Sequence, residues 1–210
     1  MGRGKRRQDK PVVLATAGTS TITEDADGGI RTWRDSLGRR HREGGPAVEY
    51  SDGGYEWWLR GARHREDGPA LESGGTREWW RHGQLHRDDG PAIEYADGTR
   101  AWYRDGERHR EDGPACEYPN GTRGWFLNGV RHREDGPAIE GPNVASEWWV
   151  NNERHREDGP AMEYLDGTRI WYLDGQELSR EEWQERIRAL SLADVVVAPG
   201  QRIRPSALTN

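Results

Sequence analysis

The sequence predicts an all-β fold: an elongated single-layer antiparallel sheet, or solenoid, of six to seven β-hairpin repeats of about 23 residues, capped by one C-terminal α-helix. The first observation behind this prediction is the heptapeptide HREDGPA and its near copies HREGGPA and HRDDGPA. They begin at His41, His64, His86, His109, His132 and His155. The second is their spacing, which is 23 residues except for one step of 22. The third is a pair of glycine turn signals in most units. Self-similarity at a fixed period is typical of a repeat array, in which each repeat packs on its neighbours.

Each unit is predicted to form two hairpins. The unit Pro91–Gly113 contains Asp97-Gly98 and Asp105-Gly106, each flanked by short segments rich in β-forming residues. Asp-Gly in this setting predicts a two-residue type I′ turn, in which both central residues have positive φ. The unit of 22 residues lacks its residue within Glu72–Arg77, at a predicted turn, where a deletion leaves the strands intact. The turn signals of other units are Asp52-Gly53, Asn120-Gly121, Asn128-Gly129, Asp166-Gly167 and Asp174-Gly175.

Two-residue turns would fix the register of the strands. They place Ile93 opposite Trp102 and Trp102 opposite His109, so these three side chains are expected on one face. The opposite face would hold Glu94, Tyr103 and Arg108. The corresponding rows are Val48–Trp57–His64, Leu71–Trp79–His86, Cys116–Trp125–His132, Ile139–Trp148–His155 and Met162–Trp171–Leu178.

The repeated histidines are interpreted as structural residues. Equivalent residues of stacked hairpins lie about 10 Å apart, whereas zinc ligands lie within about 2.3 Å of one metal, so no metal site is predicted. No catalytic residue and no cofactor is predicted either, because no unit contains a suitable nucleophile. Leu178 occupies the histidine position of the last unit, which indicates that this position accepts an apolar side chain. Each imidazole is expected to pack on tryptophan and to bond a backbone group or a nearby carboxylate such as Asp112.

The rest of the motif is expected to redirect the backbone. Gly113 would adopt positive φ, and Pro114 cannot donate to a strand ladder. The segment EDGP is therefore predicted to form a bulge or kink between successive hairpins. Cys116 occupies a position held elsewhere by aliphatic residues and is predicted to be a core residue.

The second face is the candidate partner-binding surface. Its predicted aromatic residues are Trp58, Trp80, Tyr103, Phe126, Trp149 and Tyr172, and its predicted arginines are Arg63, Arg108, Arg131 and Arg154. One interpretation is a solvated face held by cation–π pairs. The other is a protein-binding surface, since Trp, Tyr and Arg are enriched at interfaces.

Four regions are predicted along the chain: a basic flexible arm over residues 1–18, the hairpin array over 19–178, a capping helix over 179–192 and a tail over 193–210. Ser179 and Glu182 form a capping box at the start of the helix. Trp183, Ile187 and Leu190 would share one face of a helix over 180–190. A short strand is expected at Val195–Val197. Residues 20–36, which include Trp33, resemble a degenerate half-repeat.

Composition limits the classes of partner. The net charge is −6, so nucleic acid is a candidate partner only for the basic arm, residues 1–10. The single cysteine excludes a disulfide framework within the chain. No run approaches about 20 apolar residues, so no membrane span is predicted. The expected location is the cytoplasm or a virion.

The segment Tyr118–Glu140 resembles the hairpins of the MORN-repeat-variant family of bacterial and phage proteins. The shared pattern is an aromatic residue, an Asn/Asp-Gly turn and a second glycine after a short spacer, over about Trp33–Gly175. The HREDGPA motif and the LSREEW segment look most like the versions carried by phages and prophages. The resemblance implies an elongated hairpin sheet and scaffold, interaction or antitoxin roles, without shared catalytic residues. HREDGPA replaces the glycine-rich second strand of MORN repeats, which weakens transfer of their lipid-binding roles.

The expected function is therefore that of a non-enzymatic structural or protein-interaction module, such as a phage virion or assembly component. An alternative is an antitoxin or inhibitor that masks a partner enzyme, which the acidic net charge would suit. A third hypothesis is carbohydrate binding on the aromatic row. The identity of the partner and the oligomeric state are left open.

Overall fold

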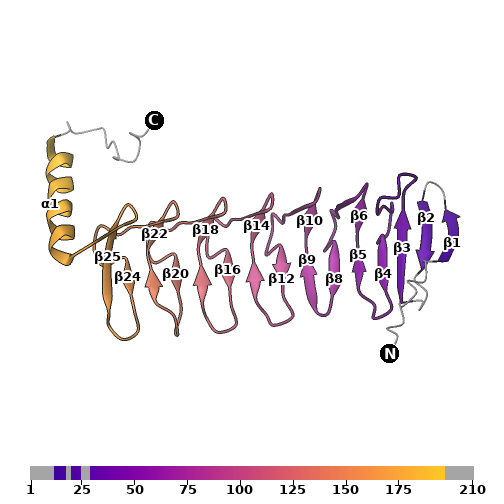
Figure 1. Ribbon diagram of the computed structural model, residues 1–210, viewed down its shortest axis with the longest axis horizontal. Helices are drawn as coiled ribbons and strands as arrows, with labels where there is room; N and C mark the ends of the chain where they lie inside the picture. Colours follow the sequence, from indigo (N-terminus) through magenta and orange to yellow (C-terminus); the bar gives the residue numbers. More distant parts are fainter. Residues whose placement is uncertain (1–11, 18–19, 25–28, 197–210) are drawn as a thin grey trace, which may run out of the picture. The chain divides into compact units, whose positions relative to one another are not determined.

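The computed structural model describes residues 12–17, 20–24 and 29–196 (Figure 1). The chain divides into two compact units, Met1–Val130 and Arg131–Asn210, and each is described by itself. The described part is built from short antiparallel strands and one helix. This confirms the predicted class, a single-layer hairpin-repeat sheet with a C-terminal helix.

The first unit adds one hairpin after another to the edge of a sheet. Its strand order is β1-β2-β3-β4-β5-β8-β9-β12-β13-β16-β17, with no crossover. The strands skipped in this order form separate two-stranded ribbons, β6-β7, β10-β11 and β14-β15. Each full repeat therefore contributes one hairpin to the sheet and one ribbon beside it. The sheet strands are Val12–Ala17 (β1), Ser20–Glu24 (β2), Ile30–Arg34 (β3), Val48–Tyr50 (β4), Tyr55–Glu56 (β5), Leu71–Ser73 (β8), Thr76–Glu78 (β9), Ile93–Glu94 (β12), Arg100–Ala101 (β13), Cys116–Glu117 (β16) and Arg123–Gly124 (β17). The strands of these ribbons are Trp58–Leu59 (β6), Ala62–Arg63 (β7), Trp80–Arg81 (β10), Gln84–Leu85 (β11), Tyr103–Arg104 (β14) and Glu107–Arg108 (β15). Phe126–Leu127 (β18) ends the first unit, and Val130–Arg131 (β19) spans the boundary between the units.

The second unit continues the same pattern and ends in the helix. Its strands are Ile139–Glu140 (β20), Ser146–Glu147 (β21), Trp149–Val150 (β22), Glu153–Arg154 (β23), Met162–Glu163 (β24), Arg169–Leu173 (β25) and Gln176–Leu178 (β26). The helix α1 spans Arg180–Val196 and packs beside β25 and β26.

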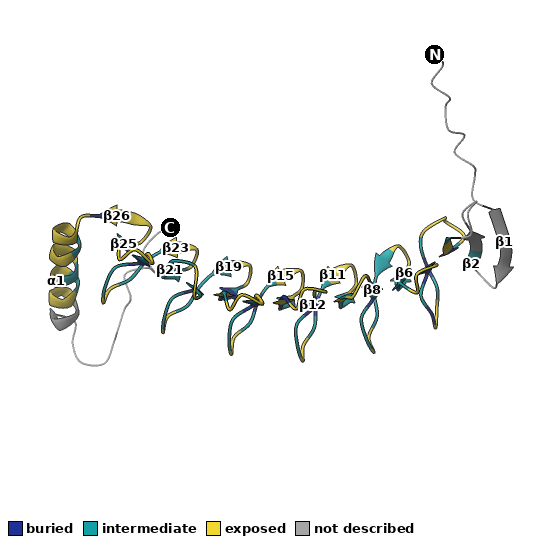
Figure 2. Cartoon of the chain, turned by 90° about the horizontal axis from the view of Figure 1, so that it is seen from below, coloured by how far each residue is buried: buried dark blue, intermediate teal, exposed yellow. Residues whose placement is uncertain are grey.

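The start of α1 carries the predicted capping box. The Ser179 backbone N–H donates to Glu182 Oε2 at 2.8 Å, and the Glu182 N–H donates to Ser179 Oγ at 3.2 Å. Trp183, Ile187 and Leu190 are half-buried, whereas the other residues from Arg180 to Ala193 are exposed; Figure 2 shows both classes of burial on this part of the helix. The Trp183 indole N–H also donates to the Arg156 carbonyl at 3.0 Å, which ties the helix to the last copy of the motif.

Both ends of the array differ from the prediction. Val12–Ala17 forms β1, paired with β2, so the predicted flexible arm is wrong for these residues. The helix continues to Val196, so the strand predicted at Val195–Val197 is wrong for its first two residues. The remainder of the arm, the basic residues 1–10 included, and residues 197–210 of the tail lie outside the described residues.

The two turns of the repeat Pro91–Gly113 are of different kinds. At the second turn Asp105 and Gly106 have φ of 49° and 86°, which confirms the two-residue turn. At the first turn only Gly98 has positive φ, and the Tyr95 N–H donates to the Thr99 carbonyl at 2.9 Å. This is a three-residue loop, a type I turn followed by a left-handed glycine. The prediction of a type I′ turn there is wrong, because an Asp-Gly pair also suits the last two positions of this longer loop.

The repeat of 22 residues shows the consequence of losing one loop residue. Its first loop contains only Gly74 and Gly75, both with positive φ, and Ser73 pairs with Thr76. Leu71 still pairs with Glu78, as Val48 pairs with Glu56 in the preceding repeat. The deletion shortens the loop and leaves the strand register unchanged, as predicted.

The longer loop shifts the cross-strand partners by one residue. Ile93 pairs with Ala101, so the predicted row Ile93–Trp102–His109 is wrong at its first step. Trp102 stands between β13 and β14, where its N–H donates to the Ala115 carbonyl of the next repeat at 2.8 Å and its carbonyl accepts the His109 N–H at 3.1 Å. The predicted pairing of Trp102 with His109 is therefore confirmed.

The core consists of small layers between neighbouring repeats. One cluster joins Ile93, Ala101, Ala115, Cys116 and Phe126. The alanine that ends each motif is completely buried, which the sequence analysis did not anticipate. These alanines are Ala47, Ala70, Ala92, Ala115, Ala138 and Ala161.

Candidate functional site

Within each unit, arginines and aromatic rings alternate along the two-stranded ribbons. Trp58 pairs with Arg63, and Tyr103 pairs with Arg108, as predicted. The Arg63 guanidinium lies 5.1 Å from the Trp58 ring and 5.3 Å from the Trp80 ring, so it joins two repeats. We call this arrangement the aromatic–arginine ladder. Its other contacts are Arg40 with Trp58, Arg108 with Tyr103 and Phe126, Arg131 with Trp149, and Arg154 with Trp149 and Tyr172.

The ladder brings together the residues that the sequence singled out as partner-binding candidates, but it does not expose them equally. All of them except Phe126 are half-buried. Phe126 is only 9% exposed and belongs to the core cluster with Ile93 and Cys116. The prediction that Ile93 and Phe126 lie on opposite faces is therefore wrong, because the chain turns between the sheet hairpin and the ribbon. Leu85, which replaces an arginine in the row, packs against the same cluster.

Carboxylates that were not among the predicted site residues hold part of the ladder. Glu56, Glu78 and Glu147 each accept the indole N–H of the tryptophan two residues later, at 2.6 Å, 2.7 Å and 3.0 Å. The available signal was the tripeptide Glu-Trp-Trp, which recurs in three units. The other units have no glutamate at the first position of this tripeptide.

Glu56 is the most enclosed of these carboxylates, with 5% exposure. It accepts the Tyr50 hydroxyl at 2.6 Å and pairs with Arg40 at 3.1 Å and Arg63 at 3.4 Å. Burial acts to raise the pKa of Glu56, but the hydrogen bonds from Tyr50 and Trp58 and the charges of Arg63 and Arg40 outweigh it and lower the pKa. Glu56 therefore remains an anion that links two arginines and two aromatic side chains.

Each motif histidine joins its own repeat to the next one. His109 Nδ1 accepts the backbone N–H of Asn128 at 3.1 Å, at the left-handed first position of the following ribbon turn. The same bond recurs from the N–H groups of Arg60, His82, Asp105, Asn151 and Asp174 to the corresponding histidines. The prediction of a structural histidine bonded to the backbone agrees with this geometry. The bond to Asp112 does not form, because Asp112 accepts the Arg110 Nε–H at 2.9 Å instead.

Leu178 supports the same interpretation, because it is 7% exposed and pairs with Trp171 in the histidine position of the last unit. We expect the substitution His109→Leu to preserve the fold and to lower the free energy of unfolding by about 1 kcal/mol, since the Asn128 N–H loses its acceptor, while the Asn128 and Glu111 side chains that also bond His109 are exposed to water. Circular dichroism and urea unfolding test this expectation. Loss of the β signal at 25 °C would show that the histidine has a larger role.

His64 gives the array a pH dependence. Burial lowers the pKa of His64 below its reference value of 6.5, and the neighbouring His82, stacked at 4.4 Å, adds to the shift. Because the folded chain binds a proton less readily than the unfolded chain, stability is present above about pH 6.5 and is lost as the pH falls through the folded pKa. We expect the free energy of unfolding to fall less steeply below pH 6.5 in His64→Leu than in the wild type. Equal slopes in urea titrations would contradict this assignment.

The arginine after each histidine organises the link between hairpins. The Arg110 guanidinium lies 4.2 Å from the Trp102 ring, and its N–H groups donate to Asp112, to the Pro114 carbonyl at 3.3 Å and to Glu117 at 3.4 Å. Equivalent stacking pairs are Arg42 on Trp33, Arg65 on Trp57, Arg87 on Trp79 and Arg156 on Trp148.

This stacking explains the glycine of the motif. Gly113 does not have positive φ, contrary to the prediction. A Cβ at this position would lie 3.1 Å from Arg110 Cζ, so a side chain would press on the stacked guanidinium. The link itself is a series of bends between hairpins and not a bulge within a ladder.

The described residues contain no group of three His, Cys, Asp or Glu side chains that could hold a metal ion. In the same part of the chain, no helix is long and apolar enough to cross a membrane. No family model matches this chain, and no curated protein matches it.

Proposed function

We propose that this chain is a non-enzymatic repeat protein that binds a protein partner through the aromatic–arginine ladder. The observation that carries the proposal is the ladder itself. Tryptophan, tyrosine and arginine are the residues most enriched in binding hot spots, and here they recur on every ribbon as half-buried side chains. Such side chains keep area to bury against a partner, while stacking already limits their rotamers and reduces the entropy lost on binding.

The role of the motif residues also favours a scaffold over an enzyme. The six histidines accept turn N–H groups, and their neighbouring arginines stack on tryptophan. These contacts account for the repetition of the motif without any reaction. A virion or assembly component and a toxin neutralised by this chain are the two kinds of protein partner that we propose to test.

The experiment compares affinity capture by three purified chains: the wild type, the double variant Trp58→Ser with Trp80→Ser, and the control Leu37→Ser. Leu37 is 74% exposed and lies outside the ladder. Capture is done from the source cells and from virions, and captured proteins are remeasured with purified components by calorimetry. We expect a partner that binds the wild type and the control, and binds the ladder variant at least tenfold more weakly, as hot-spot losses of about 2 kcal/mol imply.

Circular dichroism of all three chains shows whether the ladder variant remains folded. A partner that binds the folded ladder variant as tightly as the wild type would overturn the proposal. The identity of a partner that meets the expectation distinguishes assembly from neutralisation.

A further inference from the structure

Two successive repeats of the first unit lack the carboxylate that the two repeats before them have at the same position. Glu56 and Glu78 occupy corresponding positions in successive repeats, and the next two repeats have Ala101 and Gly124 there. Arg63 lies between two of these carboxylates and contacts both, Glu56 at 3.4 Å and Glu78 at 3.8 Å. Arg108 is the corresponding arginine between Ala101 and Gly124. It has therefore lost the carboxylate on both sides.

The Glu56 site shows how this framework holds a carboxylate. Tyr50 donates its hydroxyl to one oxygen at 2.6 Å, and Arg63 approaches the same oxygen at 3.4 Å. Tyr95, Ala101 and Arg108 each follow Tyr50, Glu56 and Arg63 by 45 residues. Two of the four donors of the Glu56 site, Tyr50 and Arg63, are thus repeated around Ala101, whereas Trp58 and Arg40 are replaced by Tyr103 and Leu85 and the acceptor is absent.

Arg108 uses only part of its hydrogen-bonding capacity. Its Nε–H donates to the Tyr103 hydroxyl at 3.2 Å, and its guanidinium lies 5.4 Å from the Phe126 ring. Among the described residues no ion pair joins Arg108 to a carboxylate, whereas Arg63 has two. A half-buried guanidinium favours a carboxylate as its acceptor, because a carboxylate can accept two parallel N–H bonds and balances the positive charge.

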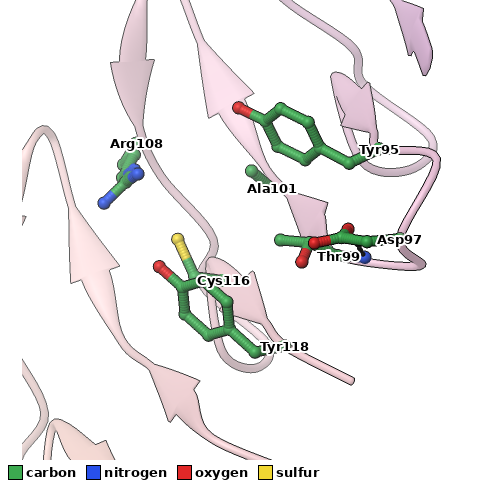
Figure 3. Close-up of a pocket in the computed structure, with 7 residues that line it drawn as sticks. All are labelled: Tyr95, Asp97, Thr99, Ala101, Arg108, Cys116 and Tyr118. Atoms are coloured by element: carbon green, nitrogen blue, oxygen red, sulfur yellow. Dashed lines mark hydrogen bonds between the residues drawn. The ribbon is translucent and has the colours of Figure 1, made fainter. Parts of the chain in front are cut away.

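A pocket of about 260 Å³ opens beside Arg108, over the small side chain of Ala101. Figure 3 shows that the hydroxyls of Tyr95 and Tyr118 lie toward the Arg108 side, while Asp97 and Thr99 lie at the opposite end. The Asp97 carboxylate is occupied within its own loop, where it accepts the Thr99 N–H at 2.8 Å. The nearby Glu78 is held by Trp80 and Arg63. Neither carboxylate therefore fills the place that Glu56 fills in its own repeat.

We propose that this pocket binds a carboxylate group, with Arg108 and the Tyr95 hydroxyl as its donors. The carboxylate belongs either to a small organic acid or to a partner polypeptide, as an acidic side chain or a chain terminus. A polypeptide carboxylate would be a group that the protein partner inserts into the pocket, so this version of the proposal rests on the proposed function. Binding of a small organic acid is independent of the proposed function.

The test uses the full chain and sodium propionate, with propionamide as the neutral isostere and inorganic phosphate as a second anion. The reporter is the Arg108 Nε–Hε resonance in ¹H–¹⁵N spectra, assigned by its loss in Arg108→Gln. We expect propionate to shift this resonance saturably and propionamide to leave it unshifted. Tyr95→Phe removes one donor and should weaken propionate binding about fivefold.

Ala101→Glu supplies the carboxylate from within the chain. It should abolish the response to propionate and raise the melting temperature, and Ala101→Gln, which fills the same space without the charge, should not raise the melting temperature. If the variants with a longer side chain at position 101 do not fold, the propionate titration of Tyr95→Phe still tests the proposal. Acidic peptides with free or amidated C-termini, compared with propionate, distinguish a polypeptide carboxylate from a small acid.

A propionate response that equals the propionamide response, or that is unchanged in Tyr95→Phe, would overturn the proposal. Phosphate that binds more tightly than propionate would also overturn it, because the site would then select charge and not a carboxylate. Loss of partner capture in Trp58→Ser with Trp80→Ser bears on the proposed function alone, since neither residue lines this pocket.

Discussion

Replacing Phe126 by alanine is expected to lower the free energy of unfolding by about 3 kcal/mol, the lower end of the range for a buried phenylalanine. The ring is 9% exposed and packs in the cluster with Ile93, Ala101 and Cys116, so its removal opens a cavity in a thin core. It also removes one of the two rings that flank Arg108. Urea unfolding followed by circular dichroism measures the change.

Tyr118→Ala is the matched control, because Tyr118 belongs to the same repeat and is 41% exposed. We expect it to cost less than about 1 kcal/mol, as most exposed substitutions do. If the two variants were equally stable, Phe126 would be a surface residue, as the sequence had indicated.

The repeat architecture could be predicted because its signals are local and recur in every unit. The fixed spacing, the glycine turns and the tolerance of Leu178 in the histidine position all follow from short segments of sequence. The capping box at Ser179 and Glu182 is likewise complete within four residues.

The face of the sheet to which each side chain points could not be predicted, because one additional loop residue changes the register of the two strands. Asp97-Gly98 suits both a two-residue turn and the end of a three-residue loop, and only the structure shows that Ile93 pairs with Ala101. The predicted rows also placed the two hairpins of a repeat on one flat surface. The chain turns between sheet strand β17 and ribbon strand β18, at Trp125, and Phe126 at the start of that ribbon packs in the core cluster.

Contacts between repeats were the other part that the sequence did not show. The acceptor role of His109 depends on a turn N–H that lies 19 residues further along the chain. The carboxylate of Glu56 is held by residues of its own and the preceding repeat, Arg40 included. Such contacts follow from the stacking distance, which no single unit specifies.

Glu56 provides the second large expected effect. Glu56→Leu should lower the free energy of unfolding at pH 7 by about 2 kcal/mol, because Tyr50 and Trp58 lose a buried acceptor and Arg40 loses its carboxylate partner. The partial exposure of both arginines keeps the loss below that of a fully buried pair. Glu56→Gln retains an acceptor of the same size and should cost less than the leucine variant.

The pH dependence of the free energy of unfolding distinguishes the contribution of the charge of Glu56 from that of its shape. The folded-state pKa of Glu56 is lowered from its reference value of 4.5, so its contribution to stability is present above about pH 4.5 and is lost as the pH falls through the folded pKa. The difference in stability between the wild type and Glu56→Gln should therefore be constant from pH 7 to about pH 5 and then shrink. Urea unfolding of both chains between pH 3 and pH 7 measures it. A difference that stays constant down to pH 3 would mean that Glu56 stabilises the ladder by its shape and hydrogen bonds, without a contribution from its charge.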